Sequence, residues 1–195
     1  MGNPPLRRGT IANRLGPEVR PPQVARQLVA AVAALAYALP LAAGGADEAL
    51  RNGYDDPHFR ATRAIAGCPV PAGPYATEAE LRAQAHRRAE KGTSCWLADD
   101  PSCTRANAYA YDREIAEHLR QDWRAHRRYA DSSLWITVQG RVVYVEGCVA
   151  RADDAARIEA AVRRLPHVQQ AIAIVTTRPR QPPPYRTRPA PPSTP

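Results

Sequence analysis

The sequence predicts an α+β fold: a two-layer sandwich in α-β-β-α-β order, preceded by a partly helical, partly irregular extension that bears disulfides. Two observations carry this prediction. Apolar residues recur at helical spacing in the segments 109–128 and 153–165. They follow the two-residue period of strands in 134–139, 142–149 and 168–175. Amphipathic helices and a one-sided sheet bury their apolar faces by packing on each other, which gives two layers.

The first of these helices has a clear apolar stripe. Ile115, Leu119 and Trp123 recur at four-residue spacing. Acidic Asp112 and Glu114 stand near its start. The basic residues near its end are Arg124, Arg127 and Arg128. This polarity suits the helix macrodipole and supports a helix over the whole segment.

The remaining elements are bounded by recognisable start and stop residues. Gly140 and Arg141 separate the first two strands and predict a tight turn. Asp153 or Asp154 is expected to cap the second helix, and Pro166 to end it. About seventy residues can form such a core, although a core of that size is marginal alone.

The extension, residues 46–107, contains one predicted helix. Thr77 and Glu80 form a capping box before a helix over 77–91, and Gly92 follows it. The part before this helix is rich in Pro and Gly and is expected to be irregular. The part after it is expected to be a loop.

The tail, residues 178–195, holds eight of the chain's 20 prolines. Proline lacks a backbone N–H and fixes its own φ, so this composition excludes a helix or a central strand. We expect an extended, largely disordered arm.

The net charge of +8 lies in the two ends of the chain. Residues 1–45 carry five Arg and one Glu, and 178–195 carry four Arg and no acid. Residues 46–177 carry equal numbers of basic and acidic side chains. A nucleic-acid-binding domain carries its positive field on its folded part, so this distribution argues against a nucleic-acid partner.

Residues 1–45 have the features of a secretory signal. Residues 28–43 are apolar and uncharged, and Arg20 and Arg26 precede them. Small residues follow, then Asp47 and Glu48. A basic region, a short apolar run and small residues before an acidic start are typical of a cleaved signal. An uncleaved N-terminal membrane anchor is the alternative.

Four cysteines follow this segment, which predicts two disulfides in an oxidising compartment. Cys95 and Cys103 flank a short turn-rich loop, which favours a local pair and leaves Cys68 with Cys148. Seven residues separate Cys95 from Cys103, more than a zinc knuckle uses, so a structural metal site is disfavoured.

The segment 112–176 resembles the BON domain family. The resemblance rests on residues 136–138, 143–149 and 165–168, with Gly147 at the family's glycine position. His167 departs from the family, which usually has glycine before the last strand. The resemblance covers a third of the chain and does not extend to residues 46–107.

The resemblance implies a BON-like domain over 108–177 and a non-enzymatic role in the periplasm. Known members are mostly envelope proteins of Gram-negative bacteria, associated with membrane integrity and proposed phospholipid contact. The implied partner is an anionic phospholipid membrane surface, with no cofactor. The alternative is a structural accessory that binds an envelope protein or a cell-wall polymer through 178–195.

The absence of common catalytic motifs from the sequence favours a non-enzymatic role. The sequence has no GxSxG, HExxH, phosphate-binding loop or dinucleotide fingerprint. One face of the helix carries three side chains that can ligate a metal, Glu114, His118 and His126. A metal site there is one interpretation. A solvated helix surface explains them more simply, so no metal is predicted.

Strand alternation places a set of polar and aromatic side chains on the sheet face away from the helices. The set is Trp135, Thr137, Tyr144, Glu146 and Cys148. This face is either an exposed contact surface or is covered by residues 46–107. We favour the cover, because Cys148 needs a partner and the extension holds the other cysteines. The candidate membrane or partner contacts are Trp135, Tyr144, Arg124, Arg127 and Arg128.

The signal interpretation predicts cleavage between Ala43 and Asp47, where small residues precede acidic ones. N-terminal sequencing of the protein purified from the periplasm is expected to begin in this interval. An intact N-terminus on that protein would contradict the prediction and favour the uncleaved anchor.

Overall fold

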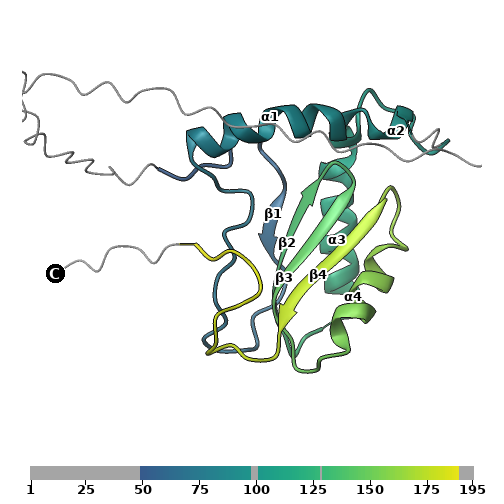
Figure 1. Ribbon diagram of the computed structural model, residues 1–195. Helices are drawn as coiled ribbons and strands as arrows, with labels where there is room; N and C mark the ends of the chain where they lie inside the picture. Colours follow the sequence, from purple (N-terminus) through teal and green to yellow (C-terminus); the bar gives the residue numbers. More distant parts are fainter. Residues whose placement is uncertain (1–48, 98–100, 128, 189–195) are drawn as a thin grey trace, which may run out of the picture. The chain divides into compact units, whose positions relative to one another are not determined.

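The computed structural model describes residues 49–97, 101–127 and 129–188 (Figure 1). The apolar segment 28–43 and Arg128 lie outside the described residues, so the structure does not bear on the signal. Within the described part, no helix combines the length and the apolar character that a membrane span needs.

The structure confirms an α+β fold and adds a strand to the predicted sheet. The strands are β1 (His58–Arg60), β2 (Ser133–Gln139), β3 (Val142–Cys148) and β4 (Gln170–Thr176). They lie in the order β1-β2-β3-β4. The first two pairings are antiparallel and the third, between β3 and β4, is parallel. The sheet is therefore mixed.

The helical elements mostly follow the sequence prediction. They are α1 (Glu78–Gly92), α2 (Ser94–Leu97), the 3₁₀ turn η2 (Ala108–Tyr111), α3 (Asp112–His126) and α4 (Asp154–Val162). The capping box of α1 is present, with the Thr77 hydroxyl accepting from Glu80 N–H. Helix α4 ends at Val162, earlier than predicted, because the chain tightens into a turn in which Leu165 N–H donates to the Val162 carbonyl.

The core lies between one sheet face and the helices α3 and α4. Figure 1 shows both helices on one side of the sheet and residues 61–76 and 177–188 on the other. The fully buried side chains of this core include Ile115, Leu119, Leu134, Ile136, Val138, Val143, Val145, Ile158 and Val162. The stripe of α3 and the inward positions of β2 and β3 thus meet as their periodicities predict.

Strand β1 corrects the expectation that the chain before α1 is irregular. The Ala61 N–H donates to the Leu134 carbonyl, and the Val138 N–H donates to the Pro57 carbonyl. Phe59 packs against the core, while its neighbours on the strand face the other way. Three residues with a single apolar side chain are too few to show a two-residue period, so only pairing with β2 reveals this strand.

The predicted turn at Gly140 and Arg141 is confirmed, and both residues have positive φ, 58° and 66°. Asp112 holds this turn: its carboxylate accepts from Gly140 N–H at 2.6 Å and from Arg141 N–H at 2.8 Å. The Arg141 guanidinium also donates to the His167 carbonyl and the Ser102 hydroxyl. These bonds compensate for the left-handed backbone of a residue with a side chain.

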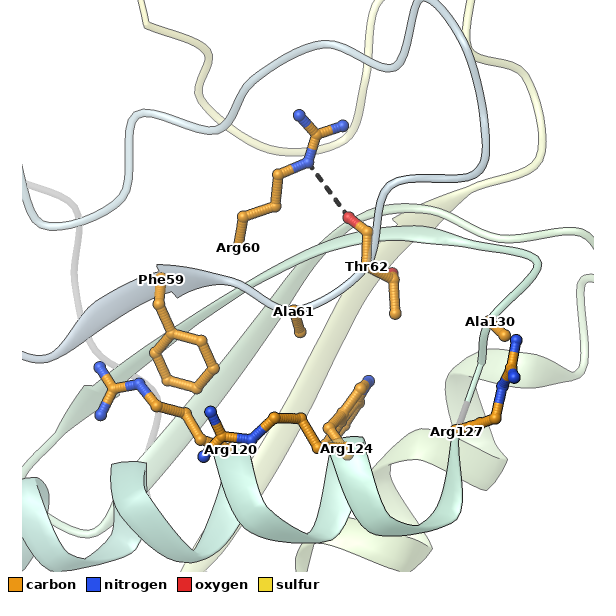
Figure 2. Close-up of a pocket in the computed structure, with 9 residues that line it drawn as sticks. Phe59, Arg60, Ala61, Thr62, Arg120, Arg124, Arg127 and Ala130 are labelled. Atoms are coloured by element: carbon orange, nitrogen blue, oxygen red, sulfur yellow. Dashed lines mark hydrogen bonds between the residues drawn. The ribbon is translucent and has the colours of Figure 1, made fainter.

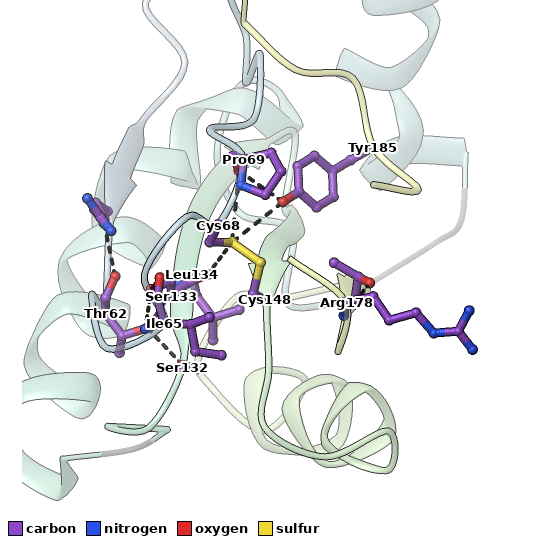
Figure 3. Close-up of a disulfide and its surroundings, with 12 residues drawn as sticks. Thr62, Ile65, Cys68, Pro69, Ser132, Ser133, Leu134, Cys148, Arg178 and Tyr185 are labelled. Carbon is purple, nitrogen blue, oxygen red and sulfur yellow. Dashed lines mark hydrogen bonds between the residues drawn. A yellow bond between two sulfur atoms is a disulfide. The ribbon is translucent and has the colours of Figure 1, made fainter. Parts of the chain in front are cut away.

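Both predicted disulfides are present. Cys95 pairs with Cys103, and Cys68 pairs with Cys148, with Cα atoms 5.4 and 5.9 Å apart. The second bridge joins the Pro-rich part of the extension to the end of β3, as Figure 3 shows. The Tyr185 hydroxyl donates to the Pro69 carbonyl beside it, at 2.9 Å.

Part of the tail differs from the predicted disordered arm. Tyr185 is only 7% exposed. The Arg188 N–H donates to the Val70 carbonyl, and the Ala72 N–H donates to the Arg186 carbonyl. An extended Pro-rich chain can pair in this way wherever it retains N–H groups. Residues 189–195 lie outside the described part.

The second sheet face is covered, as favoured from the sequence. Trp135 is 6% exposed, beneath the Arg60 guanidinium, which lies 4.5 Å from its ring centroid. His58 Nδ1 lies 2.9 Å from the Thr137 hydroxyl. The extension thus supplies the polar partners that this face requires.

Replacing both Cys68 and Cys148 by Ser should lower the melting temperature strongly and make Trp135 more accessible to acrylamide. The bridge spans 80 residues, and loops of this length contribute roughly 3–5 kcal/mol in the chain-entropy model. The matched control replaces Cys95 and Cys103, which are 8 residues apart. Unchanged fluorescence quenching in the first variant would show that the bridge does not hold the cover.

Asp112 should make stability depend on pH. Burial raises the pKa of Asp112 to about 6, although the N–H groups of Arg141 and Gly140 oppose the shift. The stabilisation from a raised carboxyl pKa is present below about pH 4 and is lost as pH rises through about 6. The advantage of the native protein over Asp112→Asn, measured by urea unfolding, should therefore shrink from pH 4 to pH 6.5. A constant difference would contradict this.

Candidate functional site: a basic groove between β1 and α3

A groove of about 440 Å³ runs between the edge strand β1 and helix α3. Figure 2 shows it with Phe59, Ala61 and Thr62 on the strand side and Arg120 and Arg124 on the helix side. The lining residues are Phe59, Arg60, Ala61, Thr62, Arg120, Trp123, Arg124, Arg127 and Ala130. Four of the nine are arginines, and no acidic side chain lines the groove.

The helix wall follows from the spacing of its residues. Arg120, Trp123 and Arg124 stand at i, i+3 and i+4, so they share one face of α3, and Arg127 is the left-handed residue that follows the helix. The strand wall exists because β1 pairs with β2 and turns Phe59 toward this helix. The groove therefore has apolar walls at Phe59, Ala61 and Trp123 and basic side chains around them.

The arginines are partly oriented by their neighbours. The Arg120 guanidinium lies 4.2 Å from the Phe59 ring centroid. Arg60 Nε donates to the Thr62 carbonyl at 3.1 Å. Glu117 lies 3.8 Å from the guanidinium nitrogens of both Arg120 and Arg124, at the long end of ion-pair distance. One carboxylate shared by two guanidinium groups leaves a local excess of positive charge.

Trp123 adds an unmet hydrogen-bond donor. Its side chain is 5% exposed, and its indole Nε1 has no acceptor among the described residues. A buried indole N–H without a partner is costly, and it usually finds one.

The structure brings together only part of the predicted contact set. Arg124 and Arg127 line the groove, and both are exposed. Arg128 lies outside the described residues. Trp135 and Tyr144 lie on the other face of the sheet, where the side chains of Arg60 and Lys91 cover them. Trp135 is buried beneath the extension, whereas Tyr144 is only partly buried. A contact role for these two residues stays a prediction.

Sequence reasoning missed the strand half of the groove. The helical spacing of Arg120, Arg124 and Arg127 was visible in the sequence and could have identified the helix wall. Phe59 and Arg60 carried no usable signal, because their position depends on the pairing of β1 with β2.

The histidines weighed as metal ligands have other surroundings. His126 Nδ1 lies 3.1 Å from the Asp122 carboxylate. Glu114, which was weighed together with His118 and His126, pairs with Arg105 and lies 3.4 Å from His167. Among the described residues, no group of three or more His, Cys, Asp or Glu side chains could hold a metal ion.

The chain matches no protein-family model, no curated protein and no solved structure.

Proposed function

We propose that the protein is a non-enzymatic, exported envelope protein whose groove contacts the anionic phospholipid surface of a membrane. The observation that carries this is the row of three arginines, Arg120, Arg124 and Arg127, beside the apolar walls, with no acidic lining residue. Each basic side chain near an anionic leaflet contributes about 1 kcal/mol to binding. Aromatic side chains that are apolar with one polar end suit the headgroup region.

Two further features support the periplasmic location. The two disulfides fit an oxidising compartment. The apolar segment 28–43 provides a route of export. The segment that resembles the BON family has the chain order α3, β2, β3, α4, β4, which is the order that its apolar periodicity predicts.

The alternative is binding through the Pro/Arg-rich tail. Two arginine side chains of the tail already have contacts within the molecule. Arg186 pairs with Glu80 at 3.0 Å. The Arg188 guanidinium lies 4.2 Å from the Tyr75 ring centroid. All three side chains are exposed, but Arg186 and Arg188 make these contacts, whereas no hydrogen bond or ion pair among the described residues engages the side chain of Arg127 in the groove. The groove is therefore the better candidate surface.

Vesicle flotation tests the proposal. The protein should float with vesicles of phosphatidylglycerol and phosphatidylcholine, and much less with phosphatidylcholine alone or at high salt. Arg124→Glu with Arg127→Glu should weaken binding by about 2 kcal/mol or more, roughly thirtyfold, from the loss of two basic side chains.

Two matched variants separate the groove from its alternatives. Arg157→Glu with Arg164→Glu makes the same change of charge at exposed residues outside both the groove and the tail, and it should retain most of the binding. Arg186→Gln with Arg188→Gln tests the tail. If the groove and control variants lose vesicle binding equally, net charge alone explains the binding and the groove proposal is wrong. If only the tail variant loses binding, the alternative is favoured.

A further inference from the structure

A second and smaller pocket lies on another part of the molecule, against helix α1. It has a volume of about 160 Å³ and is bordered by α1, η2 and the adjoining ends of β2 and β3. Every lining side chain carries a hydrogen-bond donor, and none is acidic. Such a uniform lining distinguishes it from the mixed surface around it.

Five of the lining residues have donors to spare. Among the described residues, no hydrogen bond or ion pair engages the side chains of Gln84, Arg87, Lys91, Tyr109 or Tyr144. Arg88 and Gln139 complete the lining, and both donate to the Asp56 carboxylate. The charge of Arg88 is thereby balanced, which leaves Arg87 and Lys91 as the two uncompensated cations.

Lys91 is the central feature of this pocket. It is the only lysine in the chain. Its aliphatic stem packs against Gly140: a Cβ placed on that glycine would lie 3.2 Å from Lys91 Cγ and Cε. Its ammonium group lies 5.5 Å from the Tyr144 ring centroid. Burial is the main cause that lowers the pKa of Lys91.

The nearby carboxylates are occupied elsewhere. Asp56 takes a bidentate pair from Arg88 at 2.7 and 2.9 Å. Asp112 accepts from the backbone N–H groups of Gly140 and Arg141. Neither carboxylate lies within ion-pair distance of the Lys91 ammonium. A half-buried cation without a close counter-ion is unfavourable, and a bound anion would relieve it.

We propose that this pocket binds a phosphate-sized oxyanion. The cations of Arg87 and Lys91 match a dianion, and the hydroxyls of Tyr109 and Tyr144 with the amide of Gln84 can donate to its oxygens. The volume suits a single phosphate group. The ligand is inorganic phosphate or the phosphate of a small ester, and its binding is independent of the groove between β1 and α3.

Isothermal titration calorimetry of the full-length protein tests the site, with sodium phosphate, glycerol phosphate and sodium nitrate as probes at pH 7.5. Phosphate or glycerol phosphate should bind, and nitrate should not. Lys91→Met keeps the length of the stem and should raise the dissociation constant about tenfold or more, as should Arg87→Gln. Arg164→Gln, at an exposed arginine outside this pocket and outside the groove, is the matched control and should leave the dissociation constant unchanged.

The two phosphate probes identify the source of the anion. Tighter binding of inorganic phosphate indicates the free ion, and tighter binding of glycerol phosphate indicates an ester. Equal heats for all three probes, or an unchanged dissociation constant in both pocket variants, would overturn the proposal.

A spectroscopic measurement adds a readout that does not depend on folding defects. Because the chain has one lysine, ¹³C methylation labels a single side-chain amine in addition to the N-terminal amine. Phosphate should raise the pKa of the labelled lysine, since a nearby anion favours the charged form. A pKa that phosphate does not move would exclude direct contact with Lys91.

Discussion

The Cys68–Cys148 bridge is the constraint on which the arrangement of the extension depends. A sheet with helices on one side leaves its other face open, and here that face carries Trp135. The bridge fixes a Pro-rich segment beside the end of β3, and Tyr185 bonds to that segment. The extension and the tail therefore cover one face together, although most of the sheet separates them in sequence.

The same constraint helps to create the groove. Between β1 and Cys68, the chain is held by β2: the Ala64 N–H donates to the Ser132 carbonyl, and the Ile65 N–H donates to the Ser133 hydroxyl. These bonds extend the pairing of β1 and keep Phe59 opposite α3. The basic surface is thus assembled from two distant segments, and only one of them belongs to the α-β-β-α-β unit.

The sequence was informative wherever a local rule sufficed. The capping box at Thr77, the stripe of α3, the Gly140 turn and the disulfide pairing all follow from spacing or residue type. The strand β1 and the packing of Tyr185 do not, because pairing with distant chain determines them rather than any local period. The candidate site was predictable only in part. The spacing of the arginines indicates the helix side of the groove, but no local pattern indicates the strand side.

The distribution of ion pairs explains how a neutral folded part can carry basic sites. Residues 46–177 balance in total charge, which argues against a broad positive field. Buried Asp56 is matched by Arg88, and Glu114 by Arg105, so many acids are committed to partners within the fold. The remaining arginines then concentrate locally, at the groove and beside Lys91. Net charge therefore limits the size of a basic surface. The packing of the chain determines where that surface lies.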